Sequence, residues 1–412
     1  MRNINIDDLK PGMVVAESIR DRNGRMLLGE GTELTPKHIR ICKAWGITEA
    51  IIEGESEEGG KPGFVNTTDP KSYEIANDYM LKRFMFNDQE NETVKELYRL
   101  ATIRKAIDIY NDPSLIAKLK PEPVPDMELS DFNIDRNALM QKKINLPVMP
   151  SIFHQIIEVI NDPRCSGKDI ADVVGKDTSL SAKLLKMANS AFYSLRTKVD
   201  TLTSAVAVIG TNQIGSLAMG LTVASFFKGI PNDLLDMESF WKHSLSCGLI
   251  ARFIATHKRI SNSERVFVGG LLHDIGRLVL YNYHAEPSRY ALMLSKKGDA
   301  RLYDTEYAIF GFRHATIGKV LLKKWKLPLS LENIVAYHHN PFASNDPLEP
   351  AIVQLSDIIA HALDLGTSGE GFVPPLHLKT WEYLGLQKSI FTAIAKQLDR
   401  QLSEIMRFFI KE

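Results

Sequence analysis

The spacing of apolar residues changes along this chain of 412 residues. Near its start, apolar runs are short and separated by proline and glycine, as in Met13–Val15 and Met26–Leu28. Asn23–Gly24 lies between these runs, and this dipeptide favours a two-residue β-hairpin turn. A capped helix over 35–44 and a strand over 50–52 follow. This pattern predicts a small β-rich module.

A different pattern follows a loop rich in acidic residues, glycine and proline. Apolar residues recur every three or four positions over 72–86 and 90–110, which predicts two amphipathic helices. Three alternating prolines in 120–125 then predict an extended, stiff linker. We interpret this part as a helical connector.

Nearly every later segment has helical spacing, including the long stretches 266–283 and 305–325 and the apolar stripe of 389–409. Gly269–Gly270 lacks the context of a phosphate-binding loop and indicates a close approach of neighbouring helices. The predicted fold class is therefore mainly α, an all-helical C-terminal domain with a small β-rich N-terminal domain. The expected division is 1–60 (β-rich module), 61–139 (helical connector and proline-rich linker) and 140–412 (helical domain).

Composition narrows the class of protein. Hydrophobic residues make up 44% and charged residues 24%, which is typical of globular proteins, and the formal net charge is zero. Such a charge balance excludes charge-driven binding to nucleic acid, and we expect no direct contact with it. The 3 cysteines are far apart in sequence, and we find neither a signal peptide nor an apolar run of membrane-spanning length. We therefore expect a cytoplasmic protein without membrane contact.

Histidines gather in one part of the chain. Seven of the 11 lie between His243 and His339, and they include His273 beside Asp274 and the pair His338–His339. Asp357 lies in a strongly apolar context, where an ionised carboxylate rarely lacks a partner. Imidazole and carboxylate together suit Zn, Fe, Mn or Ni. We expect His257, beside Lys258, and His284, near a helix end, to have no ligand role.

The His–Asp and His–His pairs favour two ions over one. Neighbouring residues on a helix point about 100° apart, so such a pair can straddle two ions. A carboxylate can bridge two ions about 3.5–4 Å apart, an arrangement that activates water against a phosphoryl centre. The sequence thus predicts a site for two divalent ions.

The order of these motifs resembles a known superfamily. His243, His273–Asp274–Ile275–Gly276, His314, His338–His339 and Asp357 resemble the pattern of the HD metal-dependent phosphohydrolases. Segments such as 145–150, 176–180, 188–192, 205–210 and 324–328 look more specifically like the HDOD domain of bacterial signalling proteins, over about 140–365. The start of the chain resembles the small domain that precedes some HD-GYP and HDOD modules.

The resemblance implies a metal-ligand set. His243, His273, Asp274 and Asp357 would hold one metal ion, and Asp274 would bridge to a second ion held by His314, His338 and His339. The sequence also differs from that of the HD-GYP enzymes, which hydrolyse cyclic di-GMP. Arg277 replaces a lysine, Ser239 replaces a glutamate of trinuclear relatives, and Asn340–Pro341 stands where those enzymes continue toward the GYP segment.

Two functions are compatible with these features. HDOD domains are regarded as output modules, so we favour a regulatory domain that binds a protein partner and retains a metal site. The alternative is a dinuclear metal-dependent phosphohydrolase acting on a nucleotide, in which Asp274 and Arg277 would be catalytic. A bound nucleotide ligand is compatible with either function.

Overall fold

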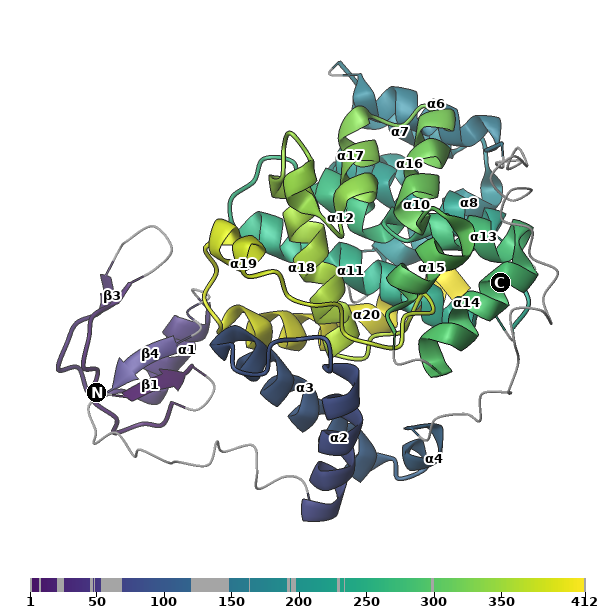
Figure 1. The fold of residues 1–412 in the computed structure, drawn as a ribbon. Helices are drawn as coiled ribbons and strands as arrows, with labels where there is room; N and C mark the ends of the chain where they lie inside the picture. Colours follow the sequence, from purple (N-terminus) through teal and green to yellow (C-terminus); the bar gives the residue numbers. More distant parts are fainter. Residues whose placement is uncertain are drawn as a thin grey trace. The chain divides into compact units, whose positions relative to one another are not determined.

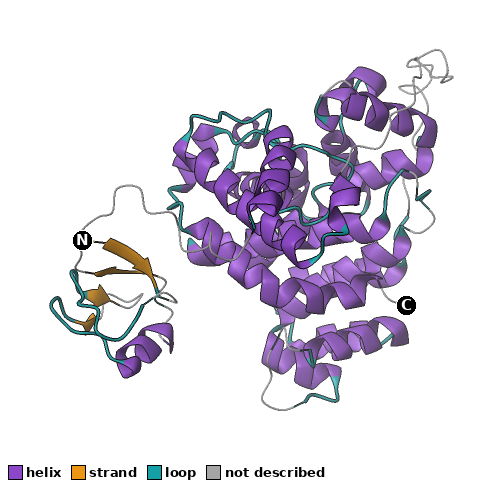
Figure 2. Ribbon diagram, turned by 90° about the horizontal axis from the view of Figure 1, so that it is seen from below, coloured by secondary structure: helices purple, strands orange, loops and turns teal. Residues whose placement is uncertain are grey.

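The computed structural model describes residues 2–6, 9–20, 26–44, 47, 49–52, 69–119, 148–162, 164–190, 193, 198–227, 230–232, 234–297 and 300–410. The chain forms two compact units, Met1–Thr67 and Thr68–Glu412, and each is described by itself. Figure 1 gives the order of the elements, and Figure 2 shows that the strands drawn lie in the N-terminal unit. The expected fold class, mainly α with a small β-rich N-terminal domain, is confirmed.

The N-terminal unit contains two antiparallel strand pairs and one helix. β1 (Arg2–Asn5) pairs with β4 (Glu49–Ile52), β2 (Ile19–Arg20) pairs with β3 (Met26–Leu28), and the helix is α1 (Pro36–Ala44). Of the two apolar runs noted in the sequence, Met26–Leu28 forms β3 and pairs with β2, whereas Val14 bridges to Glu33 and Val15 to Ile52. Val15 is fully buried and belongs to the core of this unit, whereas Asn23–Gly24 lies outside the described residues.

The second unit is helical throughout its described elements. It begins with α2 (Pro70–Arg83), α3 (Glu92–Asn111) and α4 (Leu115–Leu119). It continues with α6 (Ser151–Asn161), α7 (Gly167–Val174), α8 (Thr178–Ala188), α9 (Leu202–Ile209), α10 (Thr211–Phe226), α11 (Met237–His257), α12 (Ser263–Leu272), α13 (Ile275–Tyr283), α14 (Ala285–Lys297), α15 (Leu302–Phe310), α16 (His314–Lys324), α17 (Leu329–Tyr337), a 3₁₀ turn (Pro341–Ala343), α18 (Leu348–Ala362), α19 (Leu378–Leu384) and α20 (Ile390–Ile410).

Two long helices expected from the sequence are each broken. The stretch 266–283 divides into α12 and α13 at His273–Asp274, and 305–325 divides into α15 and α16. Gly311, with φ +76°, ends α15 in the left-handed conformation that glycine adopts without strain. Both breaks place a candidate ligand, Asp274 or His314, at the beginning of the next helix.

The helices expected as a connector are packed within the second unit. α2 and α3 form an antiparallel hairpin, and α3 also contacts α18 and α20. The expected boundary at 139/140 and the proline-rich linker lie outside the described residues. Within the described ranges, no single helix has the length and apolar character that a membrane crossing needs, although the bent pair α9 and α10 passes that test together.

Candidate metal centre

Close helix packing brings the histidines of different helices together. A Cβ on Gly270 of α12 would lie 2.8 Å from the Cα of Gly248 on α11, so the two backbones touch where glycine faces glycine. A Cβ on Gly269 would lie 2.6 Å from the Cγ2 atom of Ile334 on α17. The close approach expected at Gly269–Gly270 is confirmed. It holds the end of α12, with His273 and Asp274, between α11 and α17.

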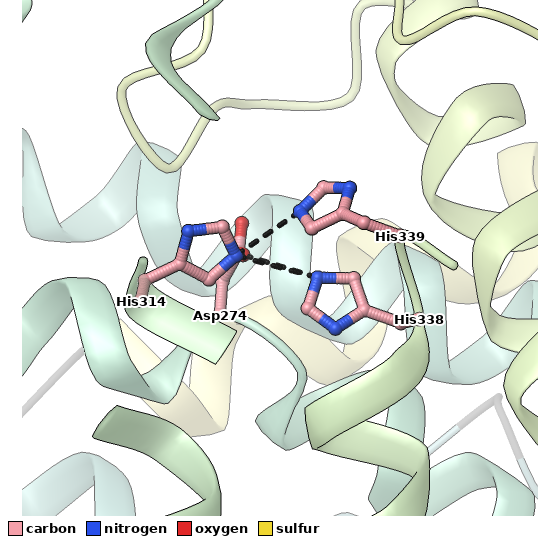
Figure 3. A group of neighbouring side chains, drawn as sticks. All are labelled: Asp274, His314, His338 and His339. Atoms are coloured by element: carbon pink, nitrogen blue, oxygen red, sulfur yellow. Dashed lines mark hydrogen bonds and ion pairs between the residues drawn. The ribbon is translucent and has the colours of Figure 1, made fainter. Parts of the chain in front are cut away.

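One group of ligand atoms surrounds Asp274 Oδ1. The Nε2 atom of His314 lies 2.9 Å and that of His338 lies 3.8 Å from this oxygen. His314 Nε2 is also 3.3 Å from His338 Nε2 and 3.1 Å from His339 Nε2. Figure 3 shows the three imidazoles turned toward the Asp274 carboxylate. These four residues, three of them buried, offer ligand atoms within 4.8 Å of one another.

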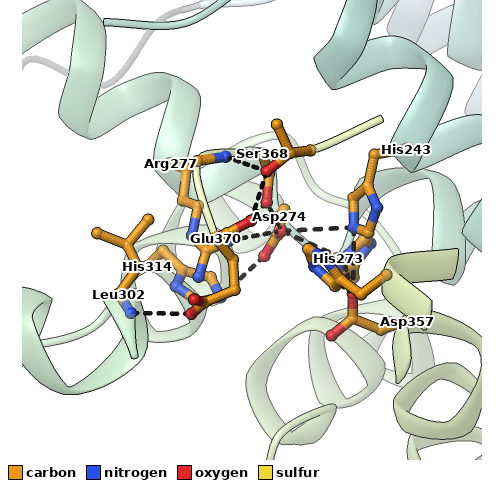
Figure 4. A network of polar contacts seen from close by, with 12 residues as sticks. His243, His273, Asp274, Arg277, Leu302, His314, Asp357, Ser368 and Glu370 are labelled. Atoms are coloured by element: carbon orange, nitrogen blue, oxygen red, sulfur yellow. Dashed lines mark hydrogen bonds and ion pairs between the residues drawn. The ribbon is translucent and has the colours of Figure 1, made fainter. Parts of the chain in front are cut away.

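A second group lies on the other side of the same carboxylate. Asp274 Oδ2 is 3.3 Å from His273 Nε2 and 3.9 Å from His243 Nε2. Asp357 Oδ1, from α18, is 3.1 Å from His243 Nε2 and 3.5 Å from His273 Nε2. Figure 4 shows Asp274 between His314 and the His243–His273–Asp357 group. All seven residues that the resemblance implies as ligands therefore lie in one cluster, and all but His339 are buried.

The hydrogen bonds of two of these rings, His273 and His338, leave their Nε2 atoms without a proton at the centre of the cluster when the rings are neutral. The Nδ1 atoms of His273 and His338 lie 2.7 and 2.8 Å from the carbonyl oxygens of Gly270 and Val335, which can only accept. Each Nδ1 therefore carries the proton, and a neutral ring presents a lone pair at Nε2. These lone pairs point at the Asp274 and Asp357 carboxylates, an arrangement that a cation between them stabilises. The donor set and its geometry fit divalent metal ions.

The electrostatics favour the metal-binding form of Asp274 and of two of the histidines. Burial lowers the pKa of His243 to about 4 and that of His338 to about 3, so both rings are neutral at pH 7. Burial alone would raise the pKa of Asp274, but the positive charges of Arg277 and His273 hold it well below its usual range. The neutral rings of His243 and His338 and the ionised Asp274 are thus in the forms that bind metal. Burial would lower the pKa of His273 and His314, but the neighbouring carboxylates raise it, so a metal ion there displaces a proton.

Arg277 lies beside the centre and is bound by three protein groups. It is 2% exposed, and its Nη1 atom is 3.1 Å from Asp274 Oδ2 and 2.5 Å from Ser368 Oγ. Its Nε atom donates to Glu306 Oε1 at 2.9 Å. The guanidinium thus holds the Asp274 carboxylate in place and is a positioning group in this structure.

Sequence reasoning missed three groups that complete the centre. Glu306 accepts a hydrogen bond from His314 Nδ1 at 2.6 Å, and Ser368 donates to Asp274 Oδ2. His361 places Nε2 3.3 Å from Asp357 Oδ1. Of these three, only His361 could have been found from the sequence, since Asp357 and His361 are four residues apart on one predicted helix. His257 and His284 belong to none of the possible metal-binding groups among the described residues.

A loop over 363–377 joins the centre to the rest of the unit. Besides the contacts of Ser368, the Ser368 carbonyl accepts a hydrogen bond from Tyr281 at 2.8 Å. Glu370 accepts from the Leu302 backbone N–H at 2.8 Å. Ser239, which stands where trinuclear relatives have a glutamate, accepts from the Thr367 N–H at 3.0 Å. Its hydroxyl therefore anchors this loop on α11.

The same loop is tied to the α2–α3 hairpin. Asp364 pairs with Arg83 at 2.6 Å and with Lys105 at 2.5 Å. The Val373 N–H donates to the Arg83 carbonyl at 2.7 Å, and the Val373 carbonyl accepts from Asn87 at 2.9 Å. The loop 363–377 therefore contacts the metal centre and the hairpin at once.

The cavity that opens on the centre is small. It measures about 50 Å³ and is lined by residues that include Arg277, Tyr303, His339, Asp357 and His361. Ligand pockets for drug-sized molecules are about 300–1,000 Å³, whereas one water needs only about 10–15 Å³. In this conformation the cavity has room for water molecules and not for a nucleotide.

The fold and the cluster together define a helical domain with a buried His/Asp set suited to divalent metal ions. Residues 146–341 match the sequence model of the HDOD domain, so this chain contains an HDOD domain, as the motifs predicted. Asp357, His361 and the loop 363–377 follow the matched segment.

Solved structures show the same fold. An HDOD domain protein of unknown function from Geobacter sulfurreducens is 25% identical, with a TM-score of 0.56 over 67% of this chain and 96% of that one. A candidate phosphohydrolase from Shewanella amazonensis is 22% identical, with a TM-score of 0.55 over 66% of this chain and 98% of that one. A candidate signal transduction protein from Marinobacter aquaeolei is 20% identical, with a TM-score of 0.52 over 78% of this chain and 66% of that one.

A curated relative, an uncharacterized protein of Treponema pallidum, is 23% identical over 213 residues. The match covers 50% of this chain and 40% of that protein, so the chain spans about two fifths of the relative's length.

Proposed function

We propose that this protein is a signalling module that binds a protein partner. Divalent metal ions held by the HDOD domain would control the conformation in which the domain binds that partner. The observation that carries the proposal is the loop 363–377, which contacts Asp274 through Ser368 and the α2–α3 hairpin through Asp364 and Val373. Ions bound at the centre would hold the Asp274 carboxylate in one position. Because the loop contacts both Asp274 and the hairpin, it would transmit this change to the hairpin.

The small cavity and the engaged guanidinium also favour regulation over nucleotide hydrolysis. The cavity beside the ligands measures about 50 Å³, and Arg277, the cationic side chain of α13, is bound to Asp274, Glu306 and Ser368. The domain holds metal ligands without the space that a nucleotide needs in this conformation.

Hydrogen exchange with and without Mn²⁺ on the full chain tests the proposal. We expect Mn²⁺ to slow exchange at the N–H groups of Thr367 and Val373, which the loop contacts protect. The effect should disappear in Asp274→Asn and persist in Asp304→Asn, which alters a more exposed carboxylate. Binding of Mn²⁺ with unchanged exchange in the loop and hairpin would overturn the proposal, and so would the absence of metal binding.

A second candidate function is a metal-dependent phosphohydrolase. It is favoured by Asp274, which turns one oxygen toward each group of histidines, as a carboxylate bridging two ions does. Bound divalent ions would polarise a phosphoryl oxygen and lower the pKa of a bound water. A screen of nucleotides and phosphodiesters separates the candidates, because turnover in the wild type that Asp274→Asn abolishes supports the enzyme.

A further inference from the structure

A third set of possible ligands lies on the α11–α18 side of the centre. Asp357 Oδ1 is 3.1 Å from His243 Nε2 and 3.3 Å from His361 Nε2, and the two imidazole centroids are 4.3 Å apart. The three residues are 3%, 0% and 1% exposed, in that order. Asp357 and His361 occupy one face of α18 because they are four residues apart, and His243 faces them from α11.

The polar atoms of this set lack ordinary partners. Among the described residues, both ring nitrogens of His243, Nδ1 of His361 and Oδ1 of Asp357 have no hydrogen bond. A buried polar atom without a hydrogen bond destabilises a protein, and most buried polar atoms in folded proteins are paired. Several of them around one carboxylate oxygen indicate a ligand at this point, and an imidazole–carboxylate set selects a divalent cation.

His243 takes part in two sets and can serve only one ion through Nε2. With His273 and Asp274, its Nε2 is 3.9 Å from the nearer carboxylate oxygen, and with Asp357 and His361 it is 3.1 Å. Asp274 Oδ2 is also engaged by Arg277 and Ser368, which compete with an ion for its lone pairs. Asp357 Oδ1 has no such competitor among the described residues. Geometry and competition both favour the set with His361.

We propose that His361 is a metal ligand, and that His243, Asp357 and His361 hold the ion on the α11 side of the centre. The ligand set implied by the family resemblance does not include His361. Asp357 and His361 also line the cavity of about 50 Å³, so water can reach the coordination positions that the three side chains leave open. The inference rests on the proposed function, since the second ion is the one held by Asp274, His314, His338 and His339.

Titration of the full chain with Mn²⁺ tests this inference, with free Mn²⁺ counted by its EPR signal after removal of metals with a chelator. We expect two ions in the wild type. His361→Gln should weaken one of them by about 10–100-fold or more and leave the other unchanged. His339→Gln should weaken the other ion. The control is His257→Gln, which removes an exposed imidazole on α11 and should bind both ions as the wild type does.

The outcomes separate the two proposals. If His361→Gln binds both ions with wild-type affinity, His361 is not a ligand and the inference fails, while the proposed function stands. The same holds if the wild type binds one ion that only His339→Gln weakens. If the wild type binds none, both fail. Should His361→Gln not fold, His361→Asn takes its place, and a thermal unfolding curve without metal verifies its fold.

Discussion

Glu306 determines which nitrogen of His314 faces the centre. Its Oε2 atom accepts from the His314 backbone N–H at 3.0 Å and from His314 Nδ1 at 2.6 Å, while Oε1 accepts from Arg277. Burial would raise the pKa of Glu306, but His314 and Arg277 lower it to about 2. The carboxylate is therefore ionised at pH 7, keeps the proton on Nδ1 and leaves Nε2 directed at Asp274.

Glu306→Gln should weaken metal binding without removing a ligand. The amide keeps the shape of the side chain but removes the charge that orients His314, and such outer partners contribute about 10–100-fold to metal affinity. The measurement is Mn²⁺ affinity by free-ion EPR. Glu349→Gln is a matched control, because Glu349 is also a buried carboxylate paired with an arginine, Arg265, and belongs to none of the metal-binding groups. Equal affinities of both variants and the wild type would contradict this role.

The sequence revealed the candidate metal ligands better than the groups that orient them. His273 and His338 are visible because each stands in a dyad within an apolar helix, a local pattern. Glu306 and Ser368 are not, since they reach Arg277 and Asp274 across 29 and 94 residues, and isolated polar residues of these types are common on surfaces. His361 lies between these cases, because its spacing from Asp357 was a usable signal.

At the scale of elements, the approach of α13 to α16 positions Asp274 against His314. A Cβ on Gly276 would lie 2.0 Å from the His314 carbonyl oxygen and 2.9 Å from the Gly318 backbone nitrogen. Only glycine permits this distance between the two helix starts. The sequence predicted both helices but joined each to its neighbour, because an apolar periodicity does not record a break of two or three residues.

Gly276→Ala should separate these helices. The new methyl group meets backbone atoms that cannot rotate away, so we expect a loss of about 1–3 kcal/mol in the free energy of unfolding. Mn²⁺ affinity should fall as well, because Asp274 moves away from His314. Urea unfolding and Mn²⁺ titration measure the two effects. In Gly371→Ala, where a Cβ would meet no atom within 4 Å, both quantities should stay at wild-type values.

Asp364 makes the attachment of the loop to the hairpin dependent on pH. Burial would raise its pKa, but Arg83 and Lys105 hold it well below its usual range. An aspartate with a depressed pKa stabilises the folded state above its unfolded pKa of about 3.9, and this stabilisation is lost as pH falls toward the folded value.

Asp364→Asn should therefore be less stable than the wild type at pH 7, by about 1–3 kcal/mol. The difference should shrink as the pH falls below about 4, where the carboxylate becomes protonated in the unfolded chain while it is still ionised in the folded protein. Asparagine suits this position because the residue has φ +55°, which asparagine tolerates. Urea unfolding of both proteins at several pH values gives the result, and a difference that does not change with pH would show that the charge contributes nothing.

At the scale of the molecule, the chain consists of two units with separate hydrophobic cores. The core of the first unit is formed by Ile6, Leu9, Val15, Ile19, Leu28, Leu34, Ile39, Cys42, Ala50 and Ile52, and no described residue of Met1–Thr67 belongs to the cores of the second. The change in apolar spacing predicted a boundary after residue 60, and the two units divide after Thr67. The sequence did not reveal that α3 packs on α18 and α20, since such contacts join surfaces far apart in sequence.

A chain that begins at Thr68 should consequently fold and bind Mn²⁺ as the full protein does. All candidate metal ligands, the loop 363–377 and its anchors Arg83 and Asn87 lie in Thr68–Glu412. We expect the same number of ions and a melting temperature within a few degrees, measured by calorimetry and Mn²⁺ titration. The isolated first unit should melt at a lower temperature, because a domain of about 60 residues buries a smaller fraction of its surface. Loss of metal binding in the shortened chain would mean that the N-terminal unit stabilises the centre directly.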